Sequence, residues 1–421
     1  MSEVRRTAVK TLQKILENKV FYSDMREEIT DISEKDAAFL NMLILTALRH
    51  LVYIRKIIKK FSPKKIAQKH IYVEYAVILA ICEILYLRTP EYATINSYVE
   101  IIKKKTNKFL GGFANAVLRK VSTNKEALIN EDKGEFFPEE FFKILKQDYD
   151  TKTIRKIETI AAKEPPLDIT VKNGPETWAE ELNGALLING SIRLNSKTDI
   201  AKLKGYDNGS WWVQDFAASL AVQIMDELKG KKVLDICAAP GGKSAQLINA
   251  GAETTCLDIS EQRLETLKEN LARLGLKAQN IIRADGLEYL KNFKDEKFDA
   301  ILLDAPCSAT GTMRRHPEIV HIKNTEDITR QSEIQKEFLK HVENALKSGG
   351  ILVYCTCSIN KMEGEEQIKK FLEENKNFKL VSVKEKETNL CHDDTIRTMP
   401  FYLEELGGMD SFFIAKLQKV G

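Results

Sequence analysis

The chain has 421 residues, a length that predicts two or three domains when a domain averages roughly 150 residues. With 43% hydrophobic and 30% charged residues, its composition is that of a globular protein and excludes an intrinsically disordered chain. No apolar run reaches the length of about 18 residues that crosses a bilayer. The first ten residues also lack the apolar core of an export signal. We therefore expect a cytoplasmic protein with no membrane partner.

The seven cysteines are scattered and odd in number, which favours reduced thiols over disulfides. Cys355 and Cys357 lie two residues apart, but no second pair accompanies them as a zinc site would require. No metal site is expected.

The net charge of +3 hides an asymmetry between the two ends of the chain. Residues 1–130 carry 23 Lys and Arg against 13 Asp and Glu, and the remainder carries 41 against 48. A basic module joined to a mildly acidic one suggests that the first contacts a polyanion. A solvated helical surface without a partner explains the same bias equally well.

Residues 1–130 are predicted to form an all-α bundle. Ser33 followed by Asp36 resembles a capping box that opens a helix over 37–49. The stretch 73–87 is apolar almost all round, which is typical of a helix in the centre of a bundle. Two further helices are expected over 94–104 and 113–121, with Gly111 and Gly112 breaking the chain between them.

Residues 131–213 are predicted to form a linker helix and a small α+β module. A helix is expected over 136–160, and Pro165 and Pro166 end the helical region. Short β-prone runs then alternate with glycine-containing turns.

Residues 214–421 alternate apolar strands with helices, notably helices over 261–274 and 328–345. This alternation predicts an α/β domain with a doubly wound parallel sheet. Ligands in such sheets bind at the carboxyl ends of the strands. The five expected strands are 233–236, 254–258, 280–283, 300–304 and 350–354.

A small-residue turn follows the first of these strands and opens a helix, a place where backbone N–H groups can approach a nucleotide-like ligand. The next strand ends at Asp258, 23 residues after Asp235, where a carboxylate can bind a ribose diol. The pairing suits NAD or S-adenosylmethionine, but the turn lacks the G-x-G-x-x-G spacing that favours NAD. It also lacks the first glycine of a P-loop. The turn consists of Cys237, Ala238, Ala239, Pro240, Gly241, Gly242 and Lys243.

Acidic and thiol side chains follow the later strands. Asp285, after the third strand, can accept the amine of an adenine, although it equally suits a turn. Asp304 and Cys307 follow the fourth strand, and Cys357 follows the fifth. Because these strand ends share one edge of the sheet, we expect the three side chains to meet in one crevice.

This set suits the methylation of cytosine at carbon-5. A thiolate that adds to carbon-6 makes the neighbouring carbon nucleophilic, and thiolates are good nucleophiles near neutral pH. A carboxyl group at ring nitrogen-3 assists this addition, and Asp304 is the natural candidate.

The motifs Asp304-Ala305-Pro306-Cys307, Thr356-Cys357-Ser358 and 239–243 resemble those of the Nol1/Nop2/Sun family of RNA cytosine-5 methyltransferases. The resemblance implies a Rossmann-like domain that binds S-adenosylmethionine through 237–243, Asp258, Asp285 and Asp304. It implies that Cys357 is the nucleophile and that Cys307 assists product release. Residues 313–318 also resemble the family's basic segment after the Pro-Cys loop, which implies RNA contacts through Arg314, Arg315 and His316. A solvated basic turn explains these residues equally well.

The motifs around Arg5-Arg6, Tyr86–Pro90 and 113–119 resemble the NusB-type RNA-binding fold. Family members with such a module act on small-subunit (16S) ribosomal RNA, so the resemblance implies that this RNA is the partner. We also expect a monomer without an obligate protein partner. The expected domains are 1–130, 131–213 and 214–421. Two departures stand out: Cys355 replaces a small or hydroxylic residue, and Asp410-Ser411-Phe412-Phe413 replaces Asp-Gly-Phe-Phe.

Three other readings stay open. A transfer-RNA cytosine methyltransferase would use the same chemistry on another substrate. An antitermination factor would bind RNA through the helical module and carry an inactive second half. A redox or zinc protein would use Cys355 and Cys357, and it predicts bound metal or a reducible disulfide.

Overall fold

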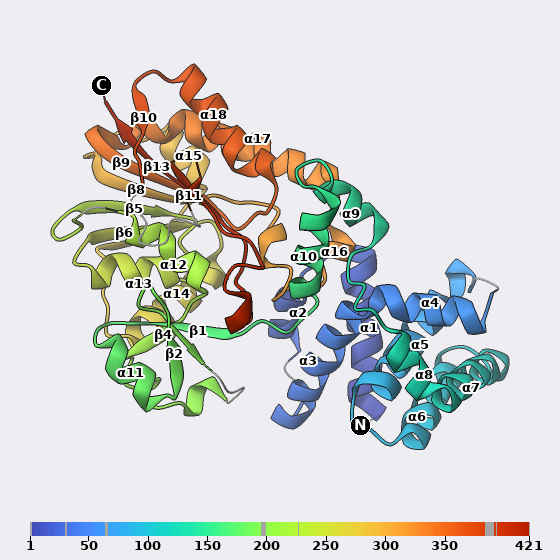
Figure 1. The fold of residues 1–421 in the computed structure, drawn as a ribbon. Coiled ribbons are helices and arrows are strands. Elements are labelled where there is room, and N and C mark those ends of the chain that lie inside the picture. Colours follow the sequence, from blue (N-terminus) through green and yellow to red (C-terminus); the bar gives the residue numbers. More distant parts are fainter. Residues whose placement is uncertain are drawn as a thin grey trace. The chain divides into compact units, whose positions relative to one another are not determined.

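The computed structural model describes residues 2–29, 32–63, 66–194, 199–225, 227–383, 391–392 and 394–420. The chain forms two compact units (Figure 1). The helical unit contains Met1–Glu164 and Met313–Asn324, and the sheet unit contains Pro165–Thr312 and Thr325–Gly421. In this two-way division, 131–164 fold with the helices and 165–213 fold with the sheet.

The helical unit is an all-α bundle around α5 (Ile71–Tyr86), as predicted. Every residue from Tyr75 to Leu85 is buried, because the helix is apolar on all sides. The one acidic residue in this run, Glu83, is paired with Arg5 at 2.7 Å and accepts a hydrogen bond from the Tyr98 hydroxyl. The other helices are α1 (Ser2–Asn18), α2 (Tyr22–Glu28), α3 (Glu34–Arg49), α4 (Leu51–Phe61), α6 (Glu91–Lys105), α7 (Lys108–Thr123), α8 (Lys125–Glu131), α9 (Glu139–Leu145), α10 (Thr151–Ala161) and α16 (Ile319–Ile322), with a 3-10 turn at Gln68–His70.

Side-chain caps explain where several helices begin. The predicted Ser33 cap of α3 is confirmed, since the Ser33 hydroxyl accepts from the Asp36 amide. The predicted break at Gly111 and Gly112 is wrong, because α7 begins at Lys108 behind the Asn107 cap and runs through both glycines. Gly111 serves packing instead: a Cβ there would lie 2.4 Å from Lys103 Cγ on α6.

The single helix predicted over 136–160 is two helices, α9 and α10. The helix is interrupted at 146–150 because the Asp150 carboxylate caps α10 by accepting a hydrogen bond from the Thr153 amide at 2.8 Å.

Residues 313–324 return to the helical unit from the middle of the sheet unit's sequence. Glu318 is fully buried and accepts a hydrogen bond from the Tyr22 amide at 3.0 Å. The Arg49 guanidinium donates to the Arg314 carbonyl oxygen, and Ile322 belongs to the bundle's hydrophobic core. Polar and apolar contacts together hold this segment in the helical unit.

The sheet unit opens with a small antiparallel sheet in the order β2-β3-β1-β4. Its strands are β1 (Leu167–Val171), β2 (Gly184–Leu186), β3 (Ile192–Leu194) and β4 (Trp211–Val213), accompanied by α11 (Pro175–Glu181) and a 3-10 turn at Ile200–Lys202. The buried pair Arg193–Asp168, at 2.7 Å, joins β3 to β1.

The large sheet has the order β11-β12-β13-β9-β8-β5-β6-β7, and β10 pairs with β13. The five predicted strands form its parallel part, whose order reverses at β5, since β6 lies on one side of β5 and β8 on the other. The strands are β5 (Lys232–Ile236), β6 (Glu253–Asp258), β7 (Asn280–Arg283), β8 (Phe298–Asp304), β9 (Leu346–Thr356), β10 (Phe378–Leu380), β11 (Cys391–His392), β12 (Thr395–Arg397) and β13 (Phe413–Lys419).

Helices cover both faces of this sheet (Figure 1). Alternating side chains of β5 face opposite cores, with Val233 in the core that includes α12 and Leu234 in the core that includes α17. One side carries α12 (Phe216–Gln223), α13 (Gly242–Asn249) and α14 (Glu261–Arg273), and the other carries α15 (Gly286–Lys291), α17 (Thr325–His341) and α18 (Glu365–Glu374). The predicted doubly wound architecture is confirmed.

Within the described ranges, no single helix has both the length and the apolar character that a membrane crossing requires. The pair α3 and α4 meets the test only when taken together, with a bend of 73° between the helices.

Candidate active site

The turn after β5 is shaped by two residues in the left-handed region, Cys237 (φ 61°) and Gly241 (φ 102°). A Cβ on Gly241 would lie 3.1 Å from Leu267 Cγ, so glycine suits both the conformation and the close packing. The Ala238 amide donates to the Leu257 carbonyl on β6, which ties the turn to the next strand. The turn thus lies where the strand order reverses.

Carboxylates occupy the neighbouring strand ends, as predicted. Asp258 ends β6, is 2% exposed, and accepts hydrogen bonds from the amides of Ala239 (3.2 Å) and Ser260 (3.0 Å). Asp285 follows β7 and caps α15 through one oxygen, which accepts from the Leu287 and Glu288 amides. One oxygen of Asp285 therefore has a local structural role.

Asp235, on β5 two residues before the turn, is fully buried. Burial raises its pKa to about 7. Oδ2 accepts from the Ser244 hydroxyl at 2.6 Å, whereas Oδ1 has no partner among the described residues. An unsatisfied buried oxygen beside this turn marks a place where a ligand or a water can bind.

Asp304 at the end of β8 is held from two sides. Lys243 Nζ lies 2.8 Å from Oδ2, and the Cys355 thiol donates to Oδ1 at 3.3 Å. Burial alone would lower the pKa of Lys243, but the charge of Asp304 and the hydrogen bond to it outweigh burial, so the pKa is raised. Lys243 therefore stays protonated and keeps a positive charge beside the Asp304 carboxylate.

The thiols of Cys307 and Cys357 meet, as the strand-end argument predicts. Their sulfur atoms lie 3.3 Å apart, although 50 residues separate them in sequence. The hydrogen bond with Cys357, followed by burial, raises the pKa of Cys307 well above its usual value. The raised pKa favours the protonated form of Cys307.

The loops that carry these thiols are fastened together. The Gly311 amide donates to the Cys357 carbonyl at 2.9 Å, and the Ser411 amide donates to the Gly311 carbonyl at 3.0 Å. A Cβ on Gly311 would lie 1.9 Å from the Ser411 carbonyl oxygen. β13 is therefore intact beside the departure at Asp410-Ser411, and the backbone of Ser411 supports the loop that follows Cys307.

The segment predicted to contact RNA belongs to the helical unit. Arg314 is fully buried within 313–324 of the helical unit, so its side chain is not exposed to a polyanion in this structure. His316 is 35% exposed at its side chain and packs edge-on against Phe21 at 5.8 Å. Arg315 and His316 are both partly exposed, so an RNA contact through these two residues stays a prediction.

Sequence reasoning missed Glu363, a fully buried carboxylate in the short 3-10 turn Lys361–Glu363. It accepts hydrogen bonds from residues next to both thiols, Ser308 and Ser358. A lone glutamate outside any periodic pattern resembles a surface residue, so no signal in one sequence marks it.

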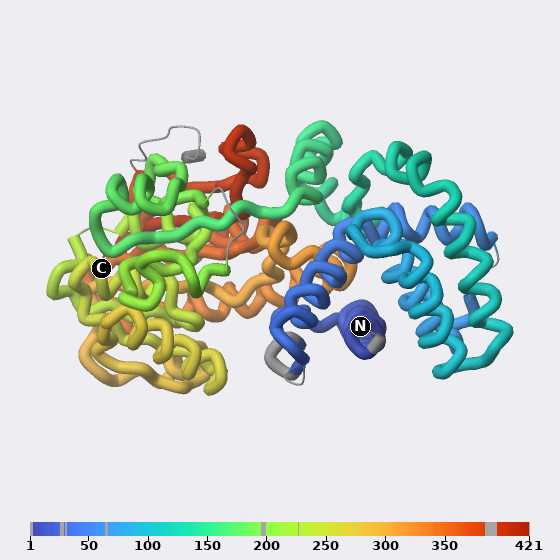
Figure 2. The backbone as a smooth tube through the Cα atoms, turned by 90° about the horizontal axis from the view of Figure 1, so that it is seen from below, coloured from blue at the N-terminus to red at the C-terminus, as the bar shows by residue number. Residues whose placement is uncertain are grey.

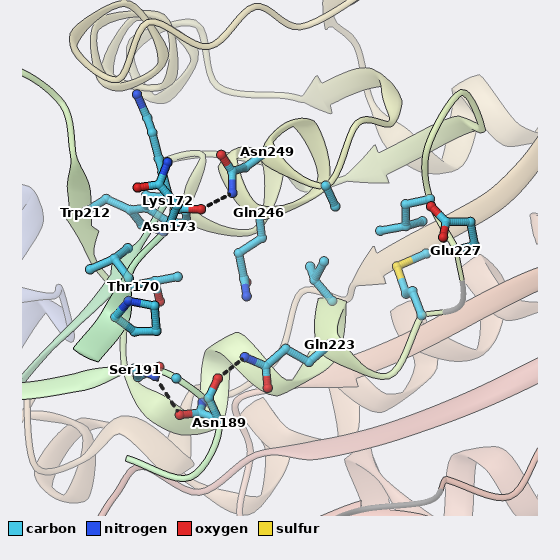
Figure 3. Close-up of a pocket in the computed structure, with 17 residues that line it drawn as sticks. Thr170, Lys172, Asn173, Asn189, Ser191, Trp212, Gln223, Glu227, Gln246 and Asn249 are labelled. Carbon is cyan, nitrogen blue, oxygen red and sulfur yellow. Dashed lines mark hydrogen bonds between the residues drawn. The ribbon is translucent and has the colours of Figure 1, made fainter. Parts of the chain in front are cut away.

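A separate cavity of about 580 Å³ lies beside α12 and α13 (Figure 3). Its amide side chains bond to the surrounding backbone: Asn249 donates to the Lys172 carbonyl, and Gln223 donates to the Asn189 carbonyl. Neither thiol of the pair lines it, nor does Asp304. The chemistry-bearing residues thus lie outside this cavity.

The fold and the strand-end site define a Rossmann-like methyltransferase class. Over 100% of this chain and 99% of the other, the structure is similar to that of PH0851, with a TM-score of 0.78 and 21% identity. It is also similar to NSun6 from Pyrococcus horikoshii, solved with SFG, with a TM-score of 0.60 and 20% identity over 68% of this chain and 99% of that one.

Two family models match: 16S rRNA methyltransferase RsmB/F over residues 222–418 and the NusB family over residues 2–123. The chain is 32% identical to ribosomal RNA small subunit methyltransferase B of Citrobacter koseri, covering 99% of both proteins. It is 33% identical to the same-named protein of Serratia proteamaculans, covering 92% of both. The chain belongs to the RsmB/F family of methyltransferases and carries an N-terminal NusB-family domain.

Proposed function

We propose that this protein transfers a methyl group from S-adenosylmethionine to carbon-5 of a cytosine in 16S ribosomal RNA, through a covalent bond between Cys357 and carbon-6. The observation that carries this proposal is the 3.3 Å approach of the Cys307 and Cys357 sulfur atoms in the unit that holds Asp304. One thiol can attack the ring while the other stays within reach of the adduct.

The first step assigns the attack to Cys357. The Cys307 thiol lies within hydrogen-bond distance of the Cys357 sulfur, and a hydrogen bond donated by Cys307 would favour attack by Cys357. The Cys357 sulfur adds to carbon-6, and the electron pair of the ring double bond moves to make carbon-5 nucleophilic. Family resemblance supports the same assignment.

Asp304 is proposed to hold the cytosine at nitrogen-3 and to assist the addition as an acid or hydrogen-bond partner. Lys243 and Cys355 fix both oxygens of its carboxyl group, so its position is set before a substrate binds. The Lys243 charge also offsets the negative charge that thiolate addition brings into the site.

Release is assigned to Cys307. Once Cys357 is bonded to carbon-6, the Cys307 thiol remains beside the adduct. Cys307 can then lose its proton to water and remove the hydrogen from methylated carbon-5. Re-formation of the ring double bond expels Cys357 as the leaving thiolate.

The residues at the strand ends fit S-adenosylmethionine, which supplies an electrophilic methyl group when bound. The fit rests on the donor set. A tight turn follows β5, the buried carboxylate of Asp258 can take a ribose diol, and the free oxygen of Asp285 can take an adenine amine. Residues 237–243 and Asp304 complete the proposed cofactor site.

The small ribosomal subunit's RNA is the proposed substrate, and a transfer RNA is the alternative. The NusB-family domain favours the ribosomal substrate, and we propose that the protein acts in the cytoplasm as a monomer. Bisulfite sequencing tests the substrate: 16S and transfer RNA from cells with and without this protein are compared. In cells without this protein, we expect one cytosine of 16S RNA to lose its protection from bisulfite conversion. Loss confined to a transfer RNA, or no loss, would overturn the assignment.

A further inference from the structure

We propose that Glu363 is a positioning residue that sets the distance between the two active-site thiols, an inference that rests on the proposed two-cysteine chemistry. Its Oε2 accepts from the hydroxyls of Ser308 and Ser358, each at 2.5 Å. Ser308 directly follows Cys307, and Ser358 directly follows Cys357. One carboxylate oxygen thus joins the residues that follow the two thiols.

The second oxygen of Glu363 is also engaged on the Cys307 side. Oε1 accepts from the Ser308 amide at 2.8 Å and from Gln335 on α17 at 3.0 Å. A fully buried carboxylate is costly unless donors surround it, and here four donors do so. Since the 3-10 turn is anchored to α17, its carboxylate can serve as a fixed reference point for both loops.

The Glu363 carbonyl secures the strand that leads to Cys357. It accepts from the Tyr354 hydroxyl at 2.9 Å and from the Thr356 hydroxyl at 3.1 Å. Arg397 holds the far side of the loop by donating to the Ser358 carbonyl at 2.5 Å. The Cys357 loop is therefore restrained on both sides of the nucleophile.

The test measures thiol geometry separately from turnover. Diamide joins adjacent thiols into a disulfide while it is itself reduced to a hydrazine, so the rate of Cys307–Cys357 crosslinking reports how often the sulfur atoms meet. Mass spectrometry of the linked peptides follows this rate in the full-length protein. For Glu363→Ala we expect slower crosslinking and a kcat lower by on the order of 100-fold, as for a misplacement of about 1 Å. The KM for S-adenosylmethionine should stay unchanged.

Glu363→Gln provides the conservative rescue. Its amide oxygen can still accept from the Ser308 amide and Gln335, and its amide group can donate to the two hydroxyls, which accept as well as donate. Crosslinking and kcat should therefore recover most of their wild-type values. Glu158→Gln is the matched control, since that buried carboxylate accepts from the Phe136 and Phe137 amides in the helical unit. It should leave crosslinking unchanged.

Single hydroxyl removals decide the matter if Glu363→Ala does not fold. Ser358→Ala removes one hydroxyl that Glu363 holds and should slow crosslinking in a protein that still binds S-adenosylmethionine. The positioning role would be overturned if Glu363→Ala formed the crosslink at the wild-type rate. If Glu363→Ala does not fold, a wild-type rate in Ser358→Ala would overturn it. Failure of the proposed function looks different: crosslinking would still respond to Glu363, but no variant would methylate RNA.

A second and independent observation concerns the turn between α6 and α7, where we infer a contact surface for single-stranded RNA. α6 and α7 lie side by side (Figure 2). Phe109, in the first turn of α7, has an exposed fraction of 81%. Lys104, Lys105 and Lys108 are exposed around it and form no ion pair within the described chain. Residues 101–125 contain seven basic residues and no acidic one.

The turn holds this surface in a defined shape. The Thr106 hydroxyl donates to the Ile102 carbonyl at 2.7 Å, and Asn107 caps α7 by accepting from the Leu110 amide. An exposed aromatic ring among lysines suits a base that stacks while its phosphates meet the positive charges. The occupant we infer is therefore an unpaired stretch of the RNA substrate.

Fluorescence anisotropy with an unstructured RNA oligonucleotide and a duplex of the same sequence tests this surface. Phe109→Ala should weaken single-strand binding about ten-fold, the contribution of stacking one base. Replacing all three lysines by glutamine should reduce the slope of the logarithm of the binding constant against the logarithm of the salt concentration by about 2. Tyr92→Ala is the control, because Tyr92 is 75% exposed at the far end of α6, near the ion pair of Glu91 and Lys125. Wild-type binding by Phe109→Ala, equal loss in Tyr92→Ala, or preference for the duplex would overturn the inference, whatever the outcome of methylation assays.

Discussion

The sulfur atoms of Cys307 and Cys357 lie 3.3 Å apart at the ends of two adjacent parallel strands. β8 and β9 pair in register up to Asp304 and Cys355, so both thiols follow the same edge of the sheet within a few residues. This relationship makes a division of labour between the two cysteines chemically possible, and it leads to separate predictions for each.

Replacing Cys357 by alanine removes the proposed nucleophile. Methylation should fall by at least about 1000-fold, while S-adenosylmethionine binding, measured by calorimetry, should persist. Cys355→Ala is the matched control two residues away: it removes one donor to Asp304 and should keep measurable turnover. The assignment would be contradicted if Cys357→Ala methylated RNA at the wild-type rate, or if only Cys355→Ala lost methylation.

Replacing Cys307 by alanine removes the proposed base but leaves the nucleophile. The reaction should stop after methyl transfer, and a covalent protein–RNA adduct should accumulate as a band of reduced mobility on denaturing gels. The double variant with Cys357→Ala should form no such band. Normal turnover without an adduct in Cys307→Ala would exclude a role in release.

Gly311 is predicted to tolerate no side chain. A Cβ there would meet the Ser411 carbonyl at 1.9 Å and the Cys357 carbonyl at 2.9 Å, so the loops must separate. Gly311→Ala should reduce the free energy of unfolding by about 3 kcal/mol and should slow methylation. Gly112→Ala serves as the control, because a Cβ added there would have no neighbour within 4 Å outside its own helix. It should stabilise the protein by about 0.5–1 kcal/mol, as denaturant unfolding will show.

The stability of the helical unit should depend on pH through His321. Burial lowers the pKa of this histidine to about 4, and its ring lies 2.9 Å from the Leu48 carbonyl. The unfolded chain, with a pKa near 6.5, therefore takes up a proton first as the pH falls. The free energy of unfolding should decrease by on the order of 2 kcal/mol between pH 6.5 and pH 4. Urea unfolding of wild type and His321→Gln at pH 7.5 and pH 5 measures this contribution. An equal loss of unfolding free energy in both proteins between the two pH values would contradict it.

Local sequence was enough to predict the elements that carry the site. Apolar runs such as 233–236 and 300–304 are strands because a strand covered on both faces needs side chains that avoid water on both sides. Errors arose where capping or packing overrode local preference. Asn107 caps α7 ahead of two glycines, and Asp150 caps α10 within the range 136–160 where a single helix was expected.

The sequence by itself determined that Asp304, Cys307 and Cys357 follow apolar strands, and parallel strands place their carboxyl ends at one edge. Only the tertiary structure decided that the two sulfur atoms meet at 3.3 Å, that Glu363 bonds to Ser308 and Ser358, and that 313–324 joins the helical unit. The physical reason is the range of the interactions. Periodicity and capping act over a few residues, whereas the Cys307–Cys357 contact depends on side chains 50 residues apart that leave no repeating pattern in the chain.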